Sequence, residues 1–562
     1  MLDQGTFEGK IVGHTAQFLG IPYAEPPSVS LLARTMTSLT VLFRVGNLRL
    51  RRPREPAPYT GRRDVTNFGP TCPQQAMPLP SEASHIPALA DSINAVLNNM
   101  YEWTTSEDED CLTINVMKPA TTAADTKLPV LVWIFGGGFQ IGGTATYGEA
   151  AQLLVERSIS LQKPAIYVSM NYRLSALGWL ASKEVQADNA ANLGLWDQRL
   201  ALQWVQKYID KFGGDPAKVT IWGESAGAIS VAMHMLSNGG DPRGLFRAAI
   251  MQSGGPIPVA GVEKGQVYYD DLVRDTGCDR DPDTLGCLRA APFASLKAAM
   301  DKSPNFFSYQ GLALPYLPRV DGDFVKESPL ELVKQKKVAQ VPMIAGDLGL
   351  INLARTSLLA QSYAGNCDDE GSLFSLGNLN LSTTADTKQF LKRYMLPNAS
   401  DGDIELMLHH YPDNPTLGCP FDTGLRNMLS FQFKRIAAIQ GDVAFHSPRR
   451  FLLKHTAGTQ PSWSFLSKRG KDTAYLGSTH ATDLMNSYGP SGELRDYIIS
   501  FTTSLNPNVG DSGNIKWPRY DPNNPQALVF QDSVVFPMKV EYDNYRSSAL
   551  DFVANISLLN PL

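Results

Sequence analysis

The sequence predicts an α/β protein organised around one large, mostly parallel β-sheet with helices on both faces. Apolar runs such as Leu128–Ile134 and Pro164–Met170 are continuous rather than alternating, which is typical of strands covered on both sides. Segments with apolar residues at helical spacing, such as Leu200–Phe212, lie between these runs. Strands that alternate with helices form a doubly wound sheet, whose reactive groups gather at the carboxyl ends of the strands.

The helix expected at Leu200–Phe212 stops at Gly213-Gly214-Asp215-Pro216, a strong terminator. No linker, repeat or low-complexity tract divides the 562 residues, so we expect one large domain with long insertions. Taken in chain order, the predicted strands are Gln17–Ala24, Leu128–Ile134, Pro164–Met170, Val219–Trp222, Ala248–Met251, Val341–Ile344 and Ser462–Leu466.

Composition excludes several classes of function. The formal net charge is −5 and the charges are interspersed, which argues against a nucleic-acid partner. No apolar run approaches the roughly 18 residues of a membrane span, so no transmembrane segment is expected. Glycine-rich phosphate loops and metal-ligand clusters are not apparent either. We therefore expect no cofactor and no metal.

The turn Gly223-Glu224-Ser225-Ala226-Gly227 carries the strongest chemical signal. It joins the strand Val219–Trp222 to the apolar segment Ala228–Leu236, which has the character of a buried helix. A G-x-S-x-G pattern between strand and helix is the nucleophile elbow of the α/β-hydrolase fold. The turn strains Ser225 and presents its hydroxyl beside the positive end of the helix. An ordinary βα turn is the alternative, which the strand and helix on either side disfavour.

A serine nucleophile needs a base, an orienting carboxylate and donors for the oxyanion. In this fold the chain order is serine, acid, histidine. His480 lies in the small-residue loop Gly477–Asp483 that follows the last predicted strand, so we expect it to be the base. Cys367-Asp368-Asp369-Glu370 offers three carboxylates after the strand Val341–Ile344. One should be buried against the imidazole, and the others should lie on a solvated face.

The oxyanion donors are expected in the triple glycine Gly136-Gly137-Gly138, which ends the buried strand Leu128–Ile134. Glycines allow backbone N–H groups to approach a substrate oxygen closely, whereas a flexible loop tip is the alternative. We assign Gly137 and Gly138 to this role, together with the N–H of Ala226.

Together these motifs resemble the type-B carboxylesterase/lipase family, in particular its fungal triacylglycerol lipase/sterol esterase branch. The resemblance covers nearly the whole chain. It is carried by the elbow, the triple glycine, Asp369-Glu370-Gly371, Phe18–Ala24, Glu109-Asp110-Cys111-Leu112, Asn171-Tyr172-Arg173 and Phe212–Pro216.

The resemblance implies a triad of Ser225, Glu370 and His480, and so selects Glu370 among the three carboxylates. It also implies the disulfides Cys72–Cys111 and Cys278–Cys287, an ion pair of Arg49 with Glu109, and a supporting hydroxyl, Ser253, near the acid. Cys367 and Cys419 receive no assigned bridge.

The loop 72–111 contains an amphipathic stretch, Ile86–Leu97, which fits a disulfide-tethered lid that meets lipid when open. A helix docked permanently on the core is the alternative. Phe306, Phe307 and Phe374 are candidates for an acyl-chain tunnel, although such aromatic residues also serve as plain core. Trp103 in the same loop raises a weaker resemblance to cholinesterases.

The amino terminus shows no signal peptide, yet the cysteine pairs and three sequons favour a secreted glycoprotein. We take the sequence to be a mature form or an incomplete gene model. The sequons begin at Asn380, Asn398 and Asn555.

Two segments, 28–44 and 347–365, interrupt the family pattern, and both contain Leu-Ala-Arg-Thr. Our hypothesis is that both are translated introns, and genuine surface loops are the alternative.

The sequence thus predicts a secreted serine hydrolase that cleaves carboxylic esters with long acyl chains, contacts a lipid interface transiently and forms an acyl-enzyme. A short-chain carboxylesterase with a fixed loop is the first alternative. A non-catalytic, cholinesterase-like adhesion module is the second.

Overall fold

The computed structural model describes residues 1–27, 48–98, 105–346, 367–489, 492–508 and 515–562. The segments 28–44 and 347–365, suspected of being translated introns, and Trp103 therefore lie outside the described residues.

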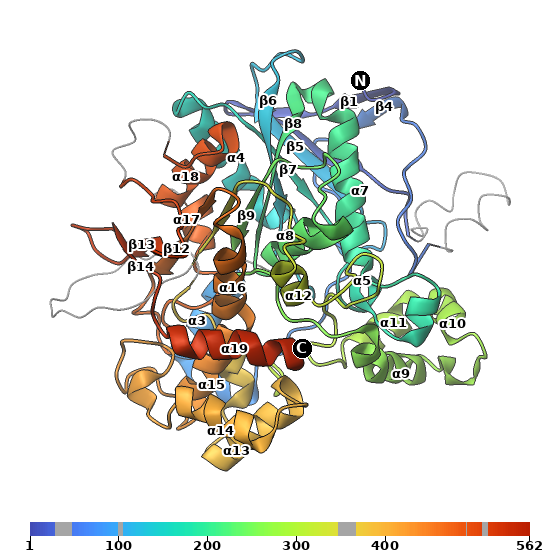
Figure 1. Ribbon diagram of the computed structural model, residues 1–562. Helices are drawn as coiled ribbons and strands as arrows, with labels where there is room; N and C mark the ends of the chain where they lie inside the picture. Colours follow the sequence, from blue (N-terminus) through green and yellow to red (C-terminus); the bar gives the residue numbers. More distant parts are fainter. Residues whose placement is uncertain (28–47, 99–104, 347–366, 490–491, 509–514) are drawn as a thin grey trace.

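A nine-stranded sheet forms the centre of the molecule, and the predicted doubly wound α/β class is confirmed (Figure 1). Its strands lie in the order β11-β10-β9-β8-β6-β7-β5-β3-β2, and the run from β11 to β7 is parallel. The strands β2, β3 and β5 extend it in antiparallel pairing. The bounds are β2 Lys10–Val12, β3 Thr15–Pro22, β5 Thr113–Pro119, β6 Leu128–Ile134, β7 Ile166–Met170, β8 Gly214–Glu224, β9 Ala248–Gln252, β10 Met343–Ala345 and β11 Ser462–Trp463.

Two small sheets flank the large one. The strand β1 (Gln4–Glu8) pairs with β4 (Thr60–Asp64), and β12 (Phe465–Lys468) pairs with β13 (Gln526–Gln531), which pairs with β14 (Met538–Tyr542).

The predicted strand Ser462–Leu466 is wrong as a single element, because the chain changes sheets within it. Its first half, β11, pairs with β10 in the large sheet, and its second half, β12, pairs with β13. The carbonyl of Ser464, between them, accepts hydrogen bonds from Leu528 N at 2.9 Å and Trp517 Nε1 at 2.7 Å. Because these partners are distant in the sequence, no local pattern predicts the change of sheets.

Helices cover both faces of the large sheet. On one face lie α4, α17 and α18, and on the other α7, α8 and α12 (Figure 1). A second apolar cluster joins α13, α14, α15 and α19. The bounds of the helices are α2 Ser81–Ser84, α3 Pro87–Leu97, α4 Gly148–Ser160, α5 Ser175–Trp179, α6 Lys183–Ala187, α7 Leu193–Tyr208, α8 Ala226–Leu236, α9 Gln266–Asp275, α10 Thr284–Ala290, α11 Phe293–Met300, α12 Pro329–Lys334, α13 Thr384–Phe390, α14 Asp401–His410, α15 Phe433–Gly441, α16 Ser447–Thr456, α17 Leu484–Tyr488, α18 Glu493–Ser504 and α19 Ser547–Leu559.

Aromatic packing fixes the strands beneath the elbow. Trp133 of β6 and Trp222 of β8 meet with ring centroids 4.4 Å apart, and Tyr488 stacks on Trp222 at 4.9 Å. All three side chains are buried and contact one another, so they fix one face of the strand that leads to Ser225.

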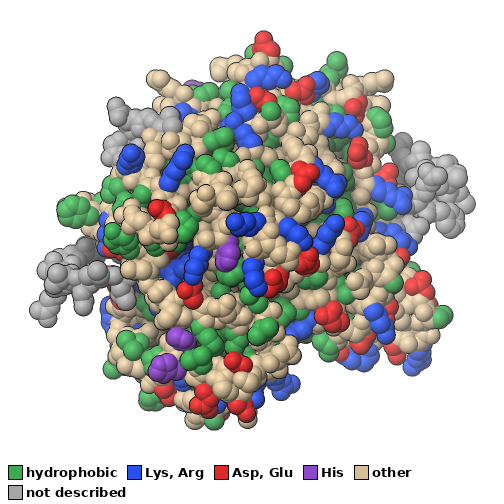
Figure 2. Space-filling model, in the orientation of Figure 1, with side chains coloured by type: hydrophobic (Ala, Val, Ile, Leu, Met, Phe, Trp, Pro, Cys, Tyr) green, Lys and Arg blue, Asp and Glu red, His purple; other side chains and the backbone are tan. Residues whose placement is uncertain are grey.

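Acidic and basic side chains are mixed on the face shown in Figure 2. None of the described helices is long and apolar enough to cross a membrane.

Candidate active site

Ser225 occupies the sharp turn between β8 and α8. Its φ of 55° and ψ of −125° are strained for a residue with a side chain. A Cβ at Gly223 would lie 2.3 Å from Gly227 C, and one at Gly227 would lie 1.9 Å from Ile134 O. Only glycine fits at these two positions, so the elbow needs both glycines of the motif.

A hydrogen-bonded chain links Ser225, His480 and Glu370. The distance from His480 Nε2 to Ser225 Oγ is 2.6 Å, and that from His480 Nδ1 to Glu370 Oε2 is 2.5 Å. The chain is consistent with the tautomer in which Nδ1–H donates to the carboxylate and Nε2 accepts from the hydroxyl. The other carboxylate oxygen, Glu370 Oε1, accepts from Cys367 N at 2.9 Å. The three groups span 255 residues of sequence and meet in one buried place.

The remaining carboxylates of the acid loop are not on a solvated face, and that expectation is wrong. Asp368 is 3% exposed and Asp369 is fully buried. Lys471 forms ion pairs with both, at 2.5 Å and 2.8 Å, and thereby compensates their burial.

The triple glycine lies directly beside the serine. Ile134 of β6 is in register with Gly223 of β8, and a Cβ at Gly136 would lie 2.7 Å from Ser225 Cβ. Gly137 and Gly138 adopt φ values of 105° and 64°, which favour glycine. Within the described residues, the N–H groups of Gly137, Gly138 and Ala226 have no protein acceptor. Three free amides beside a hydroxyl can bind an oxyanion.

Two buried carboxyl groups near the histidine escaped the sequence analysis. Glu224 Oε1 lies 3.5 Å from His480 Nε2, and neither carboxyl oxygen of Glu224 has a hydrogen-bond partner among the described residues. Asp483 accepts hydrogen bonds from Gln252 at 3.1 Å and from Ser253 at 3.2 Å. Ser253 thus contacts Asp483, and no hydrogen bond to Glu370 is present among the described residues.

Burial raises the pKa of Glu224 and Asp483 well above the usual carboxyl range. The negative charges of Asp483 and Glu370 raise the pKa of Glu224 further, and that of Glu370 raises the pKa of Asp483. Both carboxyl groups could have been identified as site residues from the sequence, since Glu224 lies inside the elbow motif and Asp483 lies three residues after His480.

Glu224→Gln should flatten the pH dependence of stability. The folded state holds a proton on Glu224 that the unfolded chain releases near pH 4, so stability falls as the pH rises from there towards the raised folded pKa. Glutamine cannot ionise and removes this loss, about 1.4 kcal/mol for each unit between the two pKa values. Tm measured from about pH 5 to 8 should therefore decline less steeply in the variant than in the parent. An unchanged slope would show that Glu224 is ionised in the folded protein.

Aromatic rings surround the histidine. Phe374 and Phe445 lie 4.9 Å and 4.6 Å from the His480 ring, measured between centroids. Phe306 contacts Phe374 at 5.8 Å and Phe307 at 4.7 Å. Phe306, Phe307 and Phe374 are expected here from the sequence, whereas Phe445 is not. Ser225 itself is almost fully buried, with 5% of its surface exposed.

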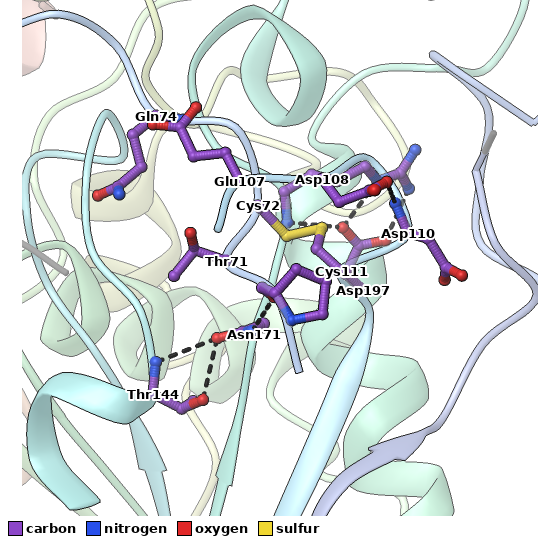
Figure 3. The surroundings of a disulfide bond; sticks show 12 residues. Thr71, Cys72, Gln74, Glu107, Asp108, Asp110, Cys111, Thr144, Asn171 and Asp197 are labelled. Atoms are coloured by element: carbon purple, nitrogen blue, oxygen red, sulfur yellow. Dashed lines mark hydrogen bonds and ion pairs between the residues drawn. A yellow bond between two sulfur atoms is a disulfide. The ribbon is translucent and has the colours of Figure 1, made fainter. Parts of the chain in front are cut away.

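Both disulfides implied by the resemblance are present. Cys72–Cys111 closes the loop that contains α3, and Cys278–Cys287 closes a short loop after α9. Figure 3 shows the first disulfide beside Asn171, whose side-chain oxygen accepts from the backbone and the hydroxyl of Thr144 at 3.1 Å.

The helix α3 buries its apolar face on the body of the protein. Leu89 and Ile93 have no exposed surface, and Val96 is 3% exposed. The apolar residues are thus spaced as an amphipathic helix requires.

Two further expectations concern charges and cysteines. Arg49 and Glu109 form the implied ion pair, with Nε to Oε1 at 2.6 Å. Cys367 and Cys419 are buried and form no disulfide within the described residues. No cluster of three or more potential metal ligands occurs in the described part of the chain.

Comparisons with known proteins agree with this architecture. A family model described as the carboxylesterase family matches residues 1–354. Lipase 5 of Diutina rugosa is 40% identical over 515 residues, which cover 89% of this chain and 85% of that protein. Secreted lipase 1 of Botryotinia fuckeliana is 39% identical over 557 residues, which cover 96% of this chain and 89% of that protein.

A third relative, the secreted triacylglycerol lipase LIP1 of Gibberella zeae, is 35% identical over 567 residues, which cover 98% of this chain and 89% of the relative. Among solved structures, the crystal structure of Aspergillus niger EstA matches with a TM-score of 0.76 at 26% identity. It covers 98% of this chain and 96% of the other. The architecture is the α/β-hydrolase fold.

Proposed function

This chain belongs to the carboxylesterase family and is a carboxylic ester hydrolase with a lipase-like function, and from that premise we propose that Ser225, His480 and Glu370 are its catalytic triad. The observation that carries the proposal is the unbroken hydrogen-bonded chain from hydroxyl through imidazole to carboxylate. It has the order and spacing that nucleophilic acyl transfer requires.

In the proposed mechanism, Ser225 Oγ attacks the ester carbonyl carbon while its proton passes to His480 Nε2. The carbonyl oxygen becomes an oxyanion, which the amides of Gly137, Gly138 and Ala226 stabilise. The intermediate collapses, the bond to the alcohol oxygen breaks, and His480 gives its proton to the leaving alcohol. Glu370 stabilises the imidazolium throughout.

Water completes the cycle. A water molecule gives a proton to His480 and attacks the acyl-enzyme, and a second tetrahedral intermediate forms at the same amides. Its collapse releases the carboxylic acid and returns the proton to Ser225. No cofactor enters these steps.

The proposed substrates are esters with long acyl chains. The rings of Phe306, Phe374 and Phe445 offer an apolar wall next to His480, and the relatives are named lipases. The loop 72–111, with α3 in it, is proposed to act as a lid whose apolar face meets lipid when open. The complete burial of Leu89 and Ile93 fits a closed lid and fits equally the alternative, a short-chain esterase whose α3 stays docked.

We also propose that the protein works outside the cell. Two disulfides, exposed sequon residues at Asn380, Asn398 and Asn555, and relatives described as secreted support this location. The complete triad geometry argues against an adhesion module that has lost catalysis.

A chain-length series tests the substrate proposal. We expect hydrolysis of nitrophenyl esters to favour long acyl chains, and hydrolysis of a triglyceride to rise steeply once the substrate exceeds its solubility and forms an interface. A sterol ester measured alongside tests the alcohol half. A rate that saturates below the solubility limit, with preference for short chains, would support the docked helix instead.

A further inference from the structure

Lys471 lies at the centre of a charged cluster behind the acid loop. Its Nζ donates to Asp369 Oδ2 at 2.8 Å, to Asp369 Oδ1 at 2.9 Å and to the carbonyl of Phe421 at 3.1 Å. It also pairs with Asp368 Oδ2 at 2.5 Å. The lysine side chain is 21% exposed, whereas the two carboxylate side chains are 4% and 0% exposed.

Asp369 ties the loop that carries the acid to the loop that carries the base. Its Oδ2 accepts from Ser478 N at 2.8 Å, and its own N–H donates to Ser478 O at 2.9 Å. Asp369 and Thr479 form an isolated parallel β-bridge between the two loops. Glu370 follows Asp369 and His480 follows Thr479, so this bridge sets the register in which the acid meets the base.

Both oxygens of the Asp369 carboxyl group accept hydrogen bonds, Oδ1 from Phe421 N at 2.7 Å and Oδ2 from Ser478 N at 2.8 Å, which suits the ionised form. Burial raises the pKa of Asp369, the neighbouring charge of Asp368 raises it further, and Lys471 is the main group that lowers it. Without the ammonium, Asp369 would remain buried with no ion pair among the described residues, whereas Asp368 would keep Lys468 at 3.6 Å. Asp369 would take up a proton or turn towards solvent, and the bond to Ser478 N would weaken.

We propose that Lys471 is a positioning residue for ester hydrolysis, which holds Asp369 in place and thereby fixes Glu370 against His480. The inference rests on the proposed triad. Catalytic groups must keep their geometry to within about 0.5 Å, and a misplacement of about 1 Å can cost 10²-fold in rate. Lys471 contacts none of the three triad side chains and acts through Asp369 alone.

The test uses a charge-balanced double variant, Lys471→Met with Asp368→Asn, which removes one cation and one anion together. We expect kcat on a soluble ester to fall by about 10- to 100-fold, with KM changed by less than about twofold. The acid limb of the kcat/KM profile should move to lower pH, because an imidazolium with a displaced Glu370 is less stable. Glu224, which also faces His480, is unchanged in this variant. Titration of active sites with a fluorophosphonate limits the comparison to folded molecules.

Lys468→Met is the matched control. Lys468 pairs with Asp368 at 3.6 Å and Asp422 at 3.3 Å but does not contact Asp369, so kcat and the pH profile should match the parent. Asp369→Asn is a second arm that leaves Lys471 paired with Asp368. It should reproduce the loss of kcat and the shifted acid limb, and it decides the matter if the double variant does not fold.

Parental kcat and an unmoved acid limb in the folded variants would overturn the proposal. So would a loss of activity that active-site titration explains fully. These outcomes leave the triad intact as long as Ser225→Ala abolishes hydrolysis. Hydrolysis that survives Ser225→Ala overturns the proposed function itself.

Discussion

Replacing Ser225 with alanine is expected to lower kcat by at least about 10⁴-fold while the protein remains folded. The variant loses the covalent path, and only substrate binding and the oxyanion donors remain to accelerate attack by water. Alanine takes the same strained backbone conformation at a similar cost, so Tm should change little. The measurement is kcat on a soluble nitrophenyl ester together with a thermal scan.

Ser237→Ala is the matched control for this variant. Ser237 lies at the end of the same helix and has the same 5% exposure, and its hydroxyl donates to His234 O at 2.9 Å. Its removal should leave kcat unchanged. Equal activity of the two variants would contradict the assignment of Ser225.

Glu370→Gln is expected to lower kcat by about 10⁴-fold with little change in KM. The amide group can donate to Nδ1, which would place the imidazole proton on Nε2, facing Ser225. In that tautomer the histidine cannot accept the serine proton. The variant keeps the size of the side chain, so the fold should remain. The kinetic constants on a soluble ester test this result.

Asp368→Asn provides the comparison within the same loop. It removes a buried charge two residues away while Lys471 keeps its pair with Asp369. We expect kcat to stay within a few-fold of the parent, because this variant removes no reacting group and changes the structure only slightly. A loss of kcat as large as that of Glu370→Gln would mean that activity depends on the structure of the loop rather than on the carboxylate of Glu370.

The sequence alone was sufficient to predict the features that depend on a local pattern of residues. The elbow needs two glycines at fixed spacing because Gly227 packs against Ile134 of β6 and Gly223 packs against Gly227, and the motif contains both glycines. Continuous apolar runs predicted the buried parallel strands for a similar reason, since both faces of the sheet are covered.

Long-range pairing set the limits of prediction. Local reasoning left Asp368, Asp369 and Glu370 as alternatives, and only the family resemblance selected Glu370. Lys471, which forms ion pairs with Asp368 and Asp369, lies about a hundred residues further along the chain. The residues around the two carboxylates therefore could not predict that they are buried and paired. The change of sheets at Ser464 likewise depends on Trp517 and Leu528.

Covalent labelling with a fluorophosphonate ester, read by peptide mass spectrometry, tests directly whether Ser225 is the nucleophile of a triad. We expect one adduct, on the peptide that contains Ser225, and a labelling rate that falls sharply in His480→Ala and in Glu370→Gln. An adduct on another residue, or labelling at the parental rate in His480→Ala, would contradict this assignment.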